Sequence, residues 1–131
     1  MIATILPGST NFHAVGYNER KVAKGTARLL EMKNFGALGT FGKPTPDELV
    51  SYLMEYTSRN DRIQKAQFHV SFSCKGHEMS EAEVLEFAHQ YLKEMGYMEE
   101  GQPLLAYSHY DTDNTHVHIV TSRIAPDLSL I

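Results

Sequence analysis

Three histidines near the C-terminal end are the residues best suited to chemistry. His116 and His118 stand two apart in an apolar run, so in a strand both rings would point to the same face of a sheet. His109 lies seven residues upstream, at the end of another apolar run. Three neutral imidazoles on one face are a typical ligand set for a divalent metal ion with open coordination positions. The spacing is more specific than that of a lone surface histidine, but by itself it leaves a metal site and a set of unrelated surface histidines equally open.

The connection between these two runs is acidic. Asp111 or Asp113 can accept the second ring proton of a ligating histidine and so fix its tautomer. The run Asp-Thr-Asp-Asn also suits a tight turn, because these side chains bond to nearby backbone. The other histidines lack this context: His13, His77 and His89 are expected at the surface. His69 lies on the polar side of its own strand, where it either borders the site or has a structural role.

The elements that must position these residues follow from the apolar patterning. Alternation over 67–73 predicts a half-buried strand, with Phe68, Val70 and Phe72 on one side. Two capping boxes, Thr45 with Glu48 and Ser80 with Glu83, mark the starts of two helices. The expected elements are strands over 2–6, 67–73, 104–108 and 116–124, helices from 46 and over 80–96, a weaker helix over 11–28, and a glycine-rich loop over 35–42. Together they predict an α+β domain, with helices covering one face of a mainly antiparallel sheet.

Composition and length suit one ordinary globular domain, over 1–131, with 42% hydrophobic and 21% charged residues. The single cysteine, Cys74, excludes an internal disulfide and a cysteine-cluster zinc site. No secretion signal or membrane-spanning run is evident, which predicts a cytoplasmic protein. The net charge of −4 counts against nucleic-acid binding, but basic residues gather locally over 20–33 and 59–65.

The segment His109-x-Asp111-x-x-Asn114-x-His116-x-His118 resembles the histidine motif of the relaxase and mobilisation-nuclease family. The segment 11–18 resembles the family's first motif, which holds its catalytic tyrosine, and 68–73 resembles its middle strand. The similarity extends over most of the chain and is closest to relaxases of Bacteroides-type mobilisable elements. It implies a relaxase or rolling-circle-initiator-like fold.

The resemblance also implies an activity and a set of roles. The protein would nick one DNA strand at a transfer origin through a covalent phosphotyrosine intermediate, with Tyr17 as the nucleophile and Asp111 as partner of the histidines. His109, His116 and His118 would hold the metal, magnesium or manganese by resemblance, although histidine ligands also accept zinc, nickel or cobalt. Tyr110, beside a metal ligand, is the competing nucleophile.

The expected partners are single-stranded DNA at the transfer origin and accessory mobilisation proteins. Candidate phosphate contacts are Arg20, Lys21, Lys24 and Arg28, and candidate base-stacking residues are Phe12, Phe35 and Phe41. Catalytic domains of the family are usually longer, so we expect this one to be incomplete at its C-terminus. An exposed sheet edge would then favour a homodimer.

Two alternatives stay open from the sequence. A rolling-circle replication initiator also uses a His-x-His motif and a tyrosine. A non-catalytic metal-binding or DNA-binding accessory protein would need no nucleophile. A two-histidine phosphoesterase fits less well, because His69-Val70-Ser71 has no convincing second copy.

Overall fold

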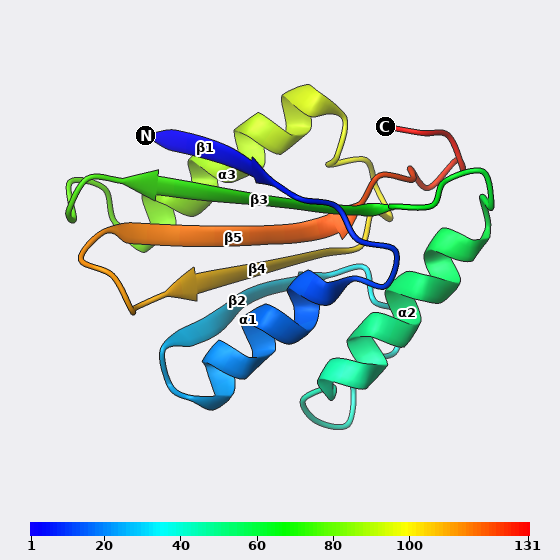
Figure 1. The fold of residues 1–131 in the computed structure, drawn as a ribbon, viewed down its shortest axis with the longest axis horizontal. Helices are drawn as coiled ribbons and strands as arrows, with labels where there is room; N and C mark the ends of the chain where they lie inside the picture. The colour runs from blue at the N-terminus through cyan, green and yellow to red at the C-terminus, as the bar shows by residue number, and fades with distance from the viewer.

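Five strands form one antiparallel sheet in the computed structural model, which describes all residues from Met1 to Ile131 (Figure 1). The strands are β1 (Ile2–Leu6), β2 (Ala27–Lys33), β3 (Gln67–Cys74), β4 (Leu104–His109) and β5 (Thr115–Ser122). Their order across the sheet is β1-β3-β5-β4-β2. The expected α+β class with an antiparallel sheet is confirmed. The strand that carries His116 and His118 is therefore the central one.

The helices lie on both faces of this sheet, not on one as expected. Helices α1 (His13–Ala23) and α2 (Pro46–Ser58) cover one face, and α3 (Glu81–Met95) covers the other (Figure 1). The reason lies in the central strands, where neighbouring residues such as Ile119 and Val120 are both fully buried and point to opposite faces. A strand that is apolar on both sides needs cover on both sides.

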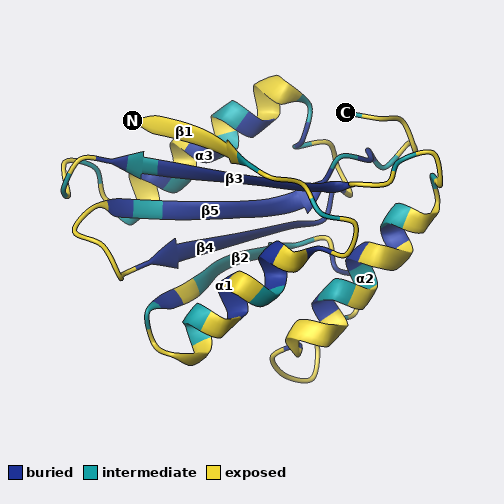
Figure 2. Ribbon diagram, in the orientation of Figure 1, coloured by how far each residue is buried: buried dark blue, intermediate teal, exposed yellow.

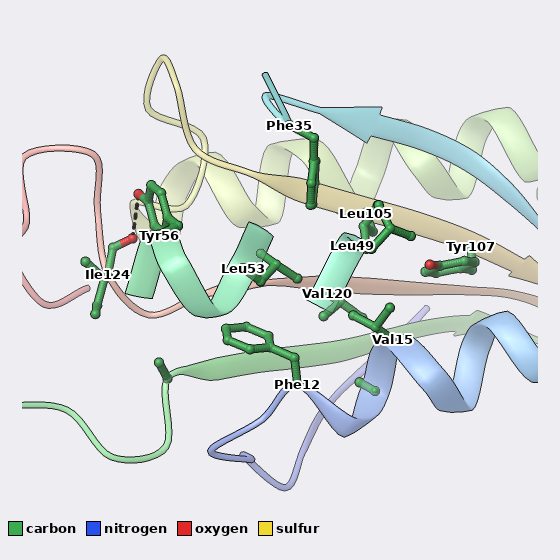
Figure 3. Close-up of a cluster of buried hydrophobic side chains, with 12 residues drawn as sticks. Phe12, Val15, Phe35, Leu49, Leu53, Tyr56, Leu105, Tyr107, Val120 and Ile124 are labelled. Carbon is green, nitrogen blue, oxygen red and sulfur yellow. Dashed lines mark hydrogen bonds between the residues drawn. The ribbon is translucent and has the colours of Figure 1, made fainter. Parts of the chain in front are cut away.

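A hydrophobic core fills the space between α1, α2 and the sheet, on the same face of the sheet as the three histidines (Figure 3). Leu49 and Leu53 of α2 pack with Val15 of α1 and Val120 of β5, and all four are buried. Strands β3, β4 and β5 are buried almost throughout, whereas β1 is largely exposed (Figure 2). The histidine-bearing strands β4 and β5 are thus among the most deeply buried elements of the molecule.

Helices α2 and α3 begin as the sequence predicts. In each, the hydroxyl of the capping residue accepts a hydrogen bond from the third helical N–H, and the glutamate carboxylate accepts one from the backbone N–H of the capping residue. Helix α3 ends at Gly96, whose φ of 91° is left-handed. None of the three helices has the length and apolar character needed to cross a membrane.

Helix α1 has no side-chain cap of its own. The residue before it, Phe12, is buried and adopts a left-handed φ of 54°. Instead, Oε1 of Gln67 on β3 accepts a hydrogen bond from the Ala14 N–H at 2.8 Å, and Gln67 Nε2 donates to the Pro7 carbonyl at 3.2 Å. The start of α1 is therefore anchored by a side chain from the sheet.

Strand β2 is the element that the sequence patterns missed. The weak helix expected over 11–28 ends at Ala23, and Gly25 turns the chain with a φ of 78°. The following residues pair with β4, with an irregularity between Leu29 and Glu31. This register break disturbs the strict alternation that identifies a strand in a sequence.

Candidate functional site

The three predicted ligands converge on the face of the sheet beneath α1. His109 ends β4 and lies directly opposite His116 of β5, and His118 follows two residues later on the same side. Their possible ligand nitrogens all lie within 4.8 Å of one another. The rings of His109 and His118 are stacked, with centroids 4.0 Å apart. The expectation that three imidazoles meet from two neighbouring strands is confirmed.

Burial keeps these imidazoles neutral. His109 and His118 are 2% and 4% exposed. Burial, with the neighbouring histidines as a smaller cause, lowers the pKa of His118 to about 2 and of His109 to about 4. Burial also lowers the pKa of His116. Neutral imidazoles at neutral pH offer nitrogen lone pairs, which is the state that a metal ligand requires.

One ring nitrogen of this cluster is left without a partner. His118 Nε2 is buried and makes no hydrogen bond, although buried polar atoms almost always have one. His118 is also one of the three histidines whose ligand atoms lie within 4.8 Å of one another. The unpaired nitrogen and the three-imidazole donor set fit a divalent cation with open positions for a substrate.

Two further residues bond to the cluster: His69, for which a place beside the site was one of two open interpretations, and Asn18, which no sequence pattern indicated. Asn18 of α1 is fully buried, with Oδ1 2.6 Å from His109 Nε2. His69 of β3 has Nε2 2.7 Å from His118 Nδ1, and burial lowers its pKa to about 4. The alternation of β3 puts His69 on the polar side of the strand, and this was the only sequence feature that could place His69 beside the site. No local pattern marks Asn18.

The expected carboxylate partner lies elsewhere. Asp111 forms an ion pair with Lys21 of α1, and no hydrogen bond joins Asp111 or Asp113 to a histidine ring. The hydrogen bond between the two side chains is the main cause that lowers the pKa of Asp111 and raises that of Lys21. Asn114 Oδ1 accepts a hydrogen bond from the Gly76 N–H at 2.8 Å, which joins the connection between β4 and β5 to the turn that follows β3.

The two candidate nucleophiles have different surroundings. Tyr17 of α1 is 40% exposed, and its ring centroid lies 6.1 Å from those of both His109 and His118. Lys21, one helical turn later, has its Nζ 5.2 Å from the Tyr17 ring centroid. The Tyr110 hydroxyl instead donates to Glu81 of α3 at 2.9 Å. Helix α3 covers the opposite face of the sheet, so this contact directs Tyr110 away from the histidines.

A cleft of about 720 Å³ opens beside the histidines. It is lined by residues 6–11, 13 and 14, by Tyr17, Lys65, Gln67 and Ser71, and by the histidines His69, His116 and His118. One wall is therefore the sheet and the other is the start of α1. The cleft gives a ligand of nucleotide size access to both the imidazoles and the Tyr17 ring.

The candidate DNA-contact residues divide into paired and unpaired cations. Arg28 lies on β2 and is paired with Glu81, as Lys21 is with Asp111. Arg20 and Lys24 are exposed and have no ion pair.

Of the candidate stacking aromatics, Phe12 and Phe35 are in the core and cannot stack on bases, which corrects that expectation, whereas Phe41 is fully exposed.

Residues 17–131 match the family model of the relaxase MobA/VirD2-like nuclease domain. The match begins at Tyr17 and includes all three convergent histidines. The chain matches no curated protein and no solved structure.

Proposed function

The chain belongs to the family of MobA/VirD2-like relaxase nuclease domains, and on that premise we propose that it nicks one DNA strand at a transfer origin, with Tyr17 as the nucleophile. The observation that carries this proposal is the position of the Tyr17 ring, 6.1 Å from two of the three convergent histidines. A tyrosine that cleaves a phosphodiester must lie beside the group that neutralises the phosphate charge.

The proposed metal site consists of His109, His116 and His118. A bound divalent cation, magnesium or manganese, would act there as a Lewis acid toward the non-bridging phosphate oxygens. The buried and unpaired His118 Nε2 supports this set. Burial of the three rings supports it too, because it favours the neutral form that can ligate.

Covalent attack by Tyr17 conserves the energy of the broken linkage. The tyrosine oxygen bonds to phosphorus, and the bond from phosphorus to the leaving strand oxygen breaks. Tyr17 loses a proton and the leaving oxygen gains one, so the step balances. The reverse reaction can rejoin the strand, as mobilisation requires.

The partners are also part of the proposal. Single-stranded DNA would enter the cleft beside Tyr17, in the cytoplasm where such DNA is processed, together with accessory mobilisation proteins. A homodimer is supported by β1, an edge strand whose Ile2 is 68% exposed. Sedimentation that gives only monomer at high concentration would count against the homodimer. The resemblance to Bacteroides-type elements stays a prediction.

The test is covalent capture of DNA. Labelled single-stranded oligonucleotides that tile the DNA around the gene are incubated with protein and Mn²⁺, and the products are separated by denaturing electrophoresis. We expect a protein–DNA band that disappears with chelator and with Tyr17→Phe but persists with Tyr110→Phe. A band lost only with Tyr110→Phe would reassign the nucleophile. Cleavage without any covalent band would indicate hydrolysis, and no effect of either variant on mobilisation would indicate an accessory role.

A further inference from the structure

The side-chain amide of Asn18 has only one orientation that satisfies its surroundings. Its Nδ2 donates to the Ala14 carbonyl at 2.8 Å, one turn earlier in α1. Rotating the amide by half a turn would set Oδ1 against that carbonyl, two acceptors face to face. Oδ1 is therefore the atom that faces His109 Nε2 at 2.6 Å. Because an amide oxygen only accepts, His109 Nε2 carries the hydrogen and Nδ1 is free.

The donor and the acceptor can also be assigned for the hydrogen bond between His69 and His118. His118 Nδ1 and His69 Nε2 are 2.7 Å apart, so one of these two nitrogens carries the hydrogen. If His69 donated, neutral His118 would have its own hydrogen on Nε2, a buried donor without an acceptor. Buried N–H groups without a partner are rare in proteins. His118 Nδ1 is therefore the donor, and its Nε2 keeps an unprotonated lone pair.

We propose that Asn18 and His69 are positioning residues of the metal site. Asn18 holds His109 for ligation through Nδ1, and His69 holds His118 for ligation through Nε2. The site thus uses different nitrogens of the two stacked rings. This inference rests on the three-histidine metal site of the proposed function, but it does not depend on which tyrosine attacks DNA.

The assignment to Asn18 ties the metal ligands to the nucleophile. Tyr17 and Asn18 are consecutive in α1, and Asn18 is fully buried against the sheet while Tyr17 reaches the cleft. A shift of α1 would thus move the partner of His109 together with Tyr17. His69 acts from the other side, because β3 pairs with β5 along the strand that carries His118.

The first test needs no variant. Long-range ¹H–¹⁵N correlation NMR of the metal-free protein at pH 7 reports which nitrogen of each imidazole bears the hydrogen. We expect the Nε2–H form for His109 and the Nδ1–H form for His118. The opposite tautomer at either histidine would overturn the assignment at that residue.

The second test compares two substitutions of His69. Glutamine places an amide oxygen near the position of Nε2 and can still accept from His118, whereas phenylalanine fills the space without an acceptor. Loss of such an outer partner typically weakens metal binding by about 10- to 100-fold. We expect that loss for His69→Phe in a titration with Mn²⁺ followed by electron paramagnetic resonance. His69→Gln should bind Mn²⁺ within about threefold of the unmodified protein, since it keeps the acceptor.

Asn18→Leu extends the comparison to His109, with circular dichroism to confirm that each variant is folded. It should weaken Mn²⁺ binding and release His109 into a mixture of tautomers, while the His118 tautomer is unchanged. Folded His69→Phe and Asn18→Leu proteins that bind Mn²⁺ as tightly as the unmodified protein would refute the positioning roles. Expected tautomers and Mn²⁺ binding without a covalent DNA band would instead refute the proposed function alone.

Discussion

Mild acid should destabilise the metal-free protein through its buried histidines. The pKa values of His69 and His109 in the folded protein are lowered to about 4, and that of His118 to about 2, from an ordinary value of 6.5. A lowered folded-state pKa means that the unfolded chain binds protons more readily. Stability is therefore fully present above about pH 6.5 and is lost as the pH falls below that value.

The size of the effect follows from the same values. A histidine that stays neutral in the folded state but titrates at 6.5 when unfolded loses about 1.3 kcal/mol of stabilisation between pH 7 and 5.5. Three such histidines in contact, two of them hydrogen-bonded to each other, should together lower the free energy of unfolding by about 2 to 4 kcal/mol. Carboxylates contribute little in this window because they titrate at lower pH.

Urea denaturation at pH 7.0 and 5.5, in the presence of chelator, measures the difference directly. His69→Gln removes one titrating ring and should reduce the pH dependence by about 1 kcal/mol. His13→Gln, at an exposed histidine outside the cluster, should leave it unchanged and serves as the control. Equal stability of the unmodified protein at the two pH values would refute the argument that burial holds these rings neutral.

Three other perturbations have expected outcomes. Mn²⁺ at one hundred times its dissociation constant should stabilise the fold by about 2.7 kcal/mol, seen as a thermal shift that chelator reverses and His118→Ala abolishes. Gln67→Ala removes the acceptor for the buried Ala14 N–H and should cost about 1 to 3 kcal/mol in urea denaturation; an unchanged midpoint would mean that α1 is held in another way. Arg20→Ala and Lys24→Ala should each reduce the salt dependence of single-strand binding by about one unit of slope at most, measured by fluorescence anisotropy. Lys21→Ala should change that slope less, because Asp111 already neutralises Lys21; the reverse ranking would contradict this reading of the charges.

The parts of the fold that the sequence predicts are those with local signals. The capping boxes at Thr45 and Ser80 identify α2 and α3 because each box involves residues three apart. The His-x-His spacing predicts a shared face because side chains alternate along a strand. The prediction that all helices cover one face of the sheet was wrong. A continuous apolar run such as that around Ile119 shows that a strand is buried, but it does not show which helix covers which face.

The parts of the site that the sequence does not predict depend on distant partners. Asn18 and His109 are 91 residues apart, and Lys21 and Asp111 are 90 apart. Asp111 was the expected partner of a histidine because it is close to His109 in sequence. In the structure, the side-chain amide of Asn18 from α1 contacts His109 instead, and Asp111 forms an ion pair with Lys21. Such choices depend on how α1 docks on the sheet, which no spacing along the chain encodes.

The anchoring of α1 by Gln67 has a consequence for the order of folding. An isolated helix of 11 residues is marginal in water, and the N-cap residue of α1, Phe12, supplies no side-chain cap. Its anchor comes 53 residues later in the chain, and the strand with His116 and His118 comes later still. We therefore expect α1 to become stable only after β3 has joined the sheet. During synthesis, the chain would then acquire its nuclease site last, after the whole sheet has left the ribosome.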